Sequence, residues 1–106
     1  MNRSERRRQE AQAGTGHRTD RATIQVWLDQ GIAHQQAGRL IEAESAYRRA
    51  LELSPDHPDT LHLLGLVSYR LNRIQEALDL LHAAVERQSS STVYWFNLGV
   101  VSQKAG

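Results

Sequence analysis

The stretch LHLLGLVSYRLNRIQEAL, residues 61–78, has a helical pattern of apolar residues, yet a glycine interrupts its most apolar part. Gly65 lies among leucines, where glycine costs a helix roughly 1 kcal/mol relative to alanine. A glycine recurs in a similar setting at Gly31 and Gly99, each 34 residues away from Gly65. A fixed step of this length indicates a repeat array rather than one globular core.

Other positions keep the same step of 34 residues. They include aromatic or apolar anchors, turn residues and small residues: Trp27, Leu61 and Trp95; Gly38, Asn72 and Gly106; Ala43 and Ala77; Tyr47 and Leu81; Ala50 and Ala84. Small side chains let two helices approach closely, so the packing that is gained can outweigh the lost helix propensity. We therefore expect the repeated glycines to lie at close helix crossings.

The pattern W-x2-L-G-x2-Y, then A-x3-F, then P, over 34 residues is typical of the tetratricopeptide repeat (TPR), and this chain resembles that family. Residues 24–57 resemble a first repeat, residues 58–91 a second, and residues 92–106 the first helix of a third. The resemblance is carried by Trp27, Gly31, Ala43, Tyr47, Ala50 and Pro55, by Leu61, Leu64, Gly65, Ala77, Leu81 and Ala84, and by Trp95, Leu98 and Gly99. The departures from the pattern are Gln30, His34, Ser68, Ser89 and Ser102.

The resemblance implies an all-α fold of antiparallel helix-turn-helix repeats stacked in a right-handed superhelix. About two and a half repeats, and so five helices, would occupy residues 23–106. The expected helices cover residues 23–37, 40–53, 58–71, 74–87 and 92–106.

Turn and cap residues mark the ends of these helices. Pro58 suits a first helical turn, with Asp56 or His57 as the cap. Asn72 tolerates the left-handed conformation of a turn. The serine run 89–91 offers a cap for the last helix.

Composition narrows the class of protein. Of the 106 residues, 40% are hydrophobic and 24% charged, which is typical of a soluble domain. The absence of cysteine excludes disulfides and thiolate metal sites. No apolar stretch approaches the roughly 18 residues of a membrane span, and no apolar segment follows the first arginines as it would in a secretory signal. We therefore expect a cytoplasmic protein without membrane contact.

Residues 1–22 differ from the rest of the chain. They hold six arginines and three acidic residues, a net charge of +3, and no large apolar residue after Met1. Such a segment buries too little surface to offset the entropy of ordering, so we expect a disordered basic leader. It is either a solubilising tail or a contact for nucleic acid or acidic membrane through residues 6–8. The lack of interleaved aromatic residues for base stacking disfavours nucleic acid.

Residues that could support catalysis or bind a metal are scattered. The densest group is DHPD, residues 56–59, with His62, and it lacks the H-E-x-x-H spacing of a helical zinc site. Gly14-Thr15-Gly16 lacks the lysine that follows the glycines of a phosphate loop. We therefore expect no enzyme activity, no cofactor and no metal site.

In TPR arrays the first helices of successive repeats line a concave groove, across which a peptide can lie. The resemblance places these residues in that groove: Gln35, Gln36, His62, Leu66, Tyr69, Arg70, Phe96, Asn97, Gln103 and Lys104. Tyr69 and Phe96 offer rigid contact area, and the two cations favour acidic residues on the ligand. The sequence thus predicts a protein-interaction scaffold that binds a peptide segment of a partner.

Comparison with two TPR subtypes narrows the class of ligand that we expect. Leu28 and Ile32 stand where one subtype holds a C-terminal carboxylate with lysine and asparagine, so that ligand is not expected. Asn97 stands in the asparagine row of the repeat arms of O-linked N-acetylglucosamine transferases, whereas Asp29 and Leu63 depart from that row.

The runs HPDTLHLLG and WFNLG resemble the N-terminal repeat arms of bacterial TPR-containing glycosyltransferases or sulfotransferases. An alternative function is therefore substrate recognition within a larger enzyme of this kind, of which the chain would be an N-terminal fragment. Gly106 stands at the turn before the helix that should cover the third repeat. Without that helix Trp95, Leu98 and Val101 would form an exposed apolar patch, so we also expect self-association through the last helix.

Overall fold

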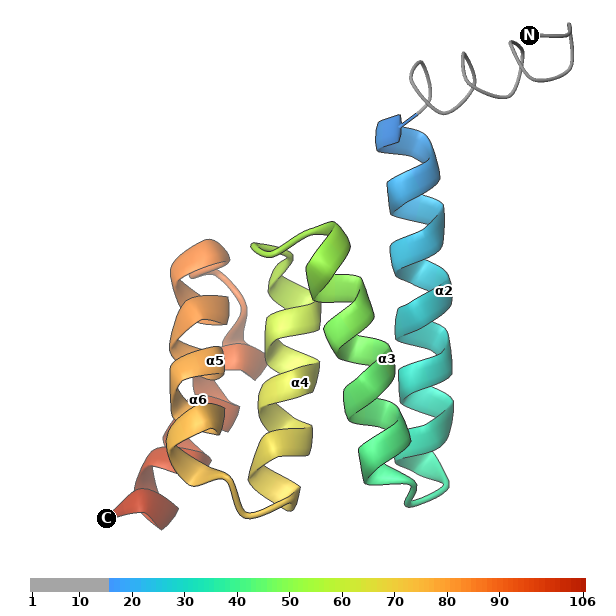
Figure 1. The fold of residues 1–106 in the computed structure, drawn as a ribbon. Coiled ribbons are helices and arrows are strands. Elements are labelled where there is room, and N and C mark those ends of the chain that lie inside the picture. Colours follow the sequence, from blue (N-terminus) through green and yellow to red (C-terminus); the bar gives the residue numbers. More distant parts are fainter. Residues whose placement is uncertain (1–15) are drawn as a thin grey trace, which may run out of the picture.

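The computed structural model describes residues 16–106. This part of the chain forms five helices and no strand: α2 (Gly16–Gln36), α3 (Leu40–Leu53), α4 (Pro58–Arg70), α5 (Ile74–Arg87) and α6 (Thr92–Ala105). Successive helices run antiparallel, and the pairs α2–α3 and α4–α5 stand next to one another, with α6 packed against the second pair (Figure 1). The predicted all-α arrangement of helix-turn-helix units is confirmed.

The turns and caps are those that the sequence predicts. α3 and α5 have the predicted bounds, and α4 and α6 end one residue early. His57 is the cap of α4, since its imidazole accepts the N–H of Thr60 at 3.4 Å. Ser91 caps α6 in the same way by accepting the N–H of Tyr94 at 3.3 Å. Asn72 has a φ of 64°, the left-handed turn conformation.

The start of α2 differs from the prediction. The helix begins at Gly16 rather than near Thr23, so the expected boundary between leader and repeats, after residue 22, lies inside it. The intervening residues include arginine and alanine but no proline, so nothing in them stops a helix from continuing outward. Residues 1–15, with the arginines at 6–8, lie outside the described part of the chain.

The repeated glycines account for close packing within each helix pair. A Cβ atom on Gly31 would lie 2.6 Å from Tyr47 Cδ1, and one on Gly65 would lie 3.0 Å from Leu81 Cδ2. In both pairs the bulky residue follows the glycine by sixteen positions. The predicted close crossing is therefore confirmed at these two glycines. Around Gly99 no described atom lies within 4 Å of an added Cβ, so no crossing helix covers it.

The core consists of two apolar clusters that share α4. Leu64 and Val67 pack with α2 and α3 around the buried Tyr47, whereas Leu61 packs with α5 and α6. Leu98 and Val101 belong to the second cluster and are 6% and 1% exposed. The expectation that these two would form an uncovered patch is wrong, because α5 already covers them. The apolar side chains that α6 does expose are Val93, Trp95, Phe96 and Val100.

Among residues 16–106, no helix combines the length and the apolar character that crossing a bilayer requires.

Candidate functional site

All ten residues predicted for the groove lie on α2, α4 and α6, the first helices of the repeats. We call the surface formed by these three helices the first-helix face. The structure separates the ten into three residues that bond within the protein, Gln35, His62 and Asn97, two that are half-buried, Leu66 and Tyr69, and five that are exposed. The half-buried and exposed residues are available to a ligand.

His62 and Asn97 belong to the first group. The imidazole Nε2 lies 2.8 Å from Asn97 Nδ2, in a hydrogen bond between α4 and α6. His62 is 8% exposed, and its ring stacks on Tyr94 with centroids 4.5 Å apart. Burial lowers the pKa of His62, and the charge of Asp59 opposes that shift. These side chains join two repeats instead of presenting polar groups to a ligand.

Tyr94, which the sequence did not single out, completes this joint. Its hydroxyl donates a hydrogen bond to the Asp59 carboxylate on α4. Burial, and then the bond to Asp59, raise the pKa of this phenol. Both polar bonds between α4 and α6, Asp59–Tyr94 and His62–Asn97, join residues 35 positions apart. A search for complementary residues one position beyond the repeat length would have found them.

Gln35 is also engaged inside the protein. The hydroxyl of Tyr47 donates to Gln35 Oε1 at 2.7 Å, so this amide faces α3. Burial raises the pKa of Tyr47 to about 12. The neighbouring Gln36 is exposed.

On the first-helix face, α6 exposes a row of large apolar side chains. Phe96 is 70% exposed, and Val93 and Val100 are 57% and 37% exposed. Their spacing of three and four residues puts them on one side of the helix. We call Val93, Phe96 and Val100 the α6 apolar row.

A pocket of about 400 Å³ lies near the carboxyl ends of α4 and α6. It is lined by Tyr69, Arg70, Asn72, Ile74 and Lys104, three of which were predicted for the groove. We call it the cationic pocket, since its charged residues are one arginine and one lysine. The structure thus brings Tyr69, Arg70 and Lys104 together from two different repeats.

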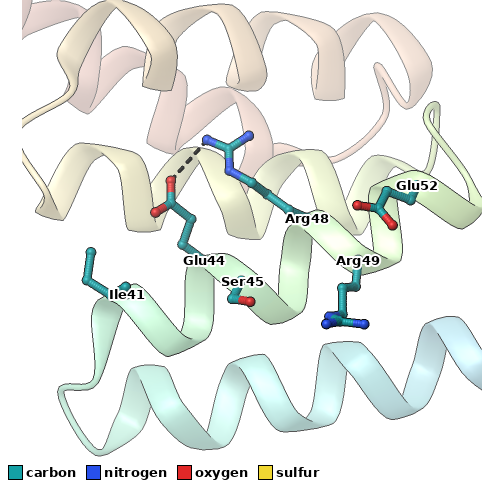
Figure 2. A pocket seen from close by; sticks show the side chains of 6 residues that line it. All are labelled: Ile41, Glu44, Ser45, Arg48, Arg49 and Glu52. Carbon is teal, nitrogen blue, oxygen red and sulfur yellow. Dashed lines mark hydrogen bonds and ion pairs between the residues drawn. The ribbon is translucent and has the colours of Figure 1, made fainter.

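A second hollow, of about 480 Å³, lies on α3 and is lined by Ile41, Glu44, Ser45, Arg48, Arg49 and Glu52 (Figure 2). Figure 2 shows Glu44 and Arg48 turned toward one another. Arg48 Nη2 lies 2.9 Å from Glu44 Oε2. Glu44 also pairs with Arg73, and Arg48 with Glu76, which ties α3 to the second repeat. Two acidic and two basic side chains line this hollow, so their charges balance. Glu44 and Arg48 are held in ion pairs that join two repeats, and we call these pairs the brace on α3.

The histidine and aspartate side chains at residues 56–62 make polar contacts within the protein. His57 is occupied as the helix cap, and its Nδ1 lies 2.7 Å from Thr60 Oγ1. Nowhere in the described chain do three or more His, Cys, Asp or Glu side chains gather in a way that could hold a metal ion. Among the side chains of residues 16–106, the buried polar atoms without a hydrogen-bond partner are His34 Nδ1 and Ser68 Oγ, and both stand where the repeat pattern expects tyrosine.

Residues 5–106 match the family described as the middle TPR-like domain of cilia and flagella-associated protein 70. The chain belongs to this TPR-like family. Tetratricopeptide repeat protein 7A of Homo sapiens is 42% identical over 69 residues, which are 65% of this chain and 8% of that protein. Tetratricopeptide repeat protein 8 of Caenorhabditis elegans is 36% identical over 62 residues, or 58% of this chain and 12% of that protein. The chain therefore spans only about a tenth of the length of these relatives.

A solved structure also resembles this TPR chain. A mutant of the O-GlcNAc transferase of Thermobaculum terrenum matches with a TM-score of 0.75 and 35% identity, over 77% of this chain and 16% of the transferase. The predicted resemblance to the repeat arm of a glycosyltransferase is confirmed. As a TPR-like module, the chain is of the class that mediates protein–protein interactions, and repeats of this class are in general not catalytic.

Proposed function

We propose that the chain binds an extended or helical segment of a partner protein on its first-helix face. The observation that carries this proposal is the exposure of the α6 apolar row. A phenylalanine that is 70% exposed between two exposed valines keeps apolar surface in water, and such patches mark interaction sites. Aromatic side chains are also the usual anchors of an interface.

The other exposed groups of this face suit a peptide ligand. Gln36 and Gln103 can hydrogen-bond a peptide backbone, whereas Gln35, His62 and Asn97 are held by bonds inside the protein. With few repeats contributing, we expect a dissociation constant on the order of 1 μM or weaker. The expected cytoplasmic location stays a prediction.

Selection from a random 12-residue peptide display library tests the proposal. The native chain should enrich peptides that carry an aromatic or large aliphatic residue. The variant Phe96→Ala should lose them, while its helical circular dichroism and Tm stay close to those of the native chain, because the removed ring is mostly in water. The matched control is Ile41→Ala, which truncates a side chain that is 58% exposed on α3.

If no peptide is enriched, or if Phe96→Ala retains the same peptides at the same strength, the first-helix face is not the binding surface.

A second candidate function is substrate recognition within a larger enzyme, and the uncovered surface at Gly99 favours the longer repeat array that this function requires. Gly31 and Gly65 each receive a bulky side chain from the next helix, whereas Gly99 is open. Together with the match to a transferase, this supports a role as the substrate-recognition arm of a larger enzyme. The gene sequence after codon 106 tests it: a stop codon there would contradict the proposal.

The same open surface supports self-association of the isolated chain. Trp95 is 50% exposed beside Gly99, and a second copy could cover both. Sedimentation equilibrium at several concentrations should then show dimers, and Trp95→Ser should weaken them. A concentration-independent monomer would exclude self-association.

A further inference from the structure

We propose that the cationic pocket binds the carboxylate of a single glutamate or aspartate on the partner segment. This inference rests on the proposed function, since it assigns the chemistry of the ligand bound by the first-helix face. It adds that the acidic residue stands at a fixed distance from the apolar residue that contacts Phe96.

The cations of the pocket have no acidic partner within the described chain. The ion pairs of residues 16–106 use Arg48, Arg73 and Arg87, and none of them involves Arg70 or Lys104. No carboxylate lines the pocket either. This is the opposite of the hollow on α3, where acidic and basic side chains balance. An external anion would supply the missing charge.

The helix ends limit how much negative charge the pocket favours. Arg70 and Lys104 stand in the last turns of α4 and α6, where each helix dipole contributes about −0.5 of a charge. Two cations and two helix ends therefore leave a net charge of about +1. One carboxylate matches this charge, so a second neighbouring acid on the ligand should add little.

The uncharged lining suits the rest of an acidic side chain. The ring of Tyr69 and the side chain of Ile74 offer apolar contact to methylene groups, and the Tyr69 hydroxyl can donate a hydrogen bond. Glutamate, with one more methylene than aspartate, should therefore bind somewhat better.

The helix sets the distance between the two contacts. Phe96 and Lys104 are eight residues apart on α6, which corresponds to about 12 Å. An extended segment rises about 3.3 Å per residue, so the acid should stand about four positions from the apolar residue. A helical segment rises about 1.5 Å per residue and would need a separation of about eight positions.

The experiment uses synthetic, fluorescein-labelled versions of the peptides enriched by the native chain, with binding measured by fluorescence anisotropy. Replacing the acidic residue by glutamine should weaken binding about threefold to tenfold, and less at high salt. The variant Arg70→Gln, Lys104→Gln should bind the acidic and glutamine peptides equally. The variant Arg21→Gln, Arg39→Gln removes the same charge from exposed arginines outside the pocket and should keep the preference.

Circular dichroism melts establish that both double variants are folded. The inference is overturned if the enriched peptides lack an acid, if the glutamine peptide binds the native chain equally well, or if the pocket variant keeps the preference. In each of these outcomes peptide binding itself still stands. If the library yields no peptide at all, the proposed function and this inference both fail.

Discussion

The imidazole of His62 lies stacked on the ring of Tyr94, with centroids 4.5 Å apart and planes inclined by 28°. This contact joins α4 to α6 and is supported by the hydrogen bond that Asn97 Nδ2 donates to His62 Nε2. Because the histidine is buried, its charge state affects how firmly the last helix is held.

Acid should weaken the fold through His62. Burial lowers its pKa below the ordinary value of 6.5 although Asp59 acts against this, so the folded chain binds the proton less well than the unfolded chain. The free energy of unfolding should therefore fall as the pH drops below about 6.5. Urea unfolding at pH 7.5 and 5.5 should show a smaller loss for His62→Gln than for the native chain. His82→Gln, at an exposed histidine, should lose as much as the native chain.

Alanine at the three repeated glycines should have three different effects. Gly99→Ala should stabilise the chain by about 0.5–1 kcal/mol, since no atom of the described residues lies within 4 Å of the new methyl group. Gly31→Ala should destabilise it by about 1–3 kcal/mol, because the buried ring of Tyr47 occupies the space. Gly65→Ala should fall between them, as Leu81 needs to move only slightly. Urea midpoints check the order, and equal shifts would contradict the packing described.

The carboxylate of Glu44 should be the most important charge of the brace on α3. Its side chain is 12% exposed and pairs with Arg48 and Arg73. Glu44→Ala should cost about 1–2 kcal/mol of stability, because both arginines are roughly half exposed and can turn to water. The exposed pair Arg87–Asp56 is the control, and Arg87→Gln should change stability by less than about 0.5 kcal/mol. A cost for Arg87→Gln as large as that for Glu44→Ala would argue against the brace.

The buried phenol of Tyr47 should make the fold sensitive to alkali. Its pKa of about 12 exceeds the value of 10 in an unfolded chain, so its contribution is complete below pH 10 and is lost as the pH rises toward 12. Tyr47→Phe should lower stability at pH 8 by about 1 kcal/mol, since Gln35 loses its donor. Between pH 8 and pH 11 the variant should lose less stability than the native chain. Equal losses would show that this phenol is not buried.

The sequence predicted the helix ends well where cap and turn residues mark them. Pro58, Asn72 and the serine run fix helix ends by local chemistry, and the structure has those ends. The start of α2 was missed because residues of the types that cap helices recur through this stretch, at Thr15, Thr19, Asp20 and Thr23, so the sequence does not single out one start.

The sequence predicted which helices carry the candidate site, but not which of their side chains are free to contact a ligand. Gln35, His62 and Asn97 lie on the expected helices, yet their polar groups bond across helices. These side chains bond to residues that are 12 to 35 positions away in the sequence. Such pairs can be identified only once the packing of the helices is known. The cationic pocket combines residues of two repeats for the same reason.

The polar bonds between α4 and α6 join residues 35 apart in a chain that repeats every 34, and this offset limits how such an array can grow. If residues 58–91 were duplicated in tandem, His62 would meet a copy of Leu63 instead of Asn97. Asp59 would likewise meet a copy of Thr60 instead of the Tyr94 hydroxyl. The second repeat is therefore not self-complementary at these two positions, and its polar side chains match the helix that follows it. Lengthening this array by gene duplication would require compensating substitutions at the new junction.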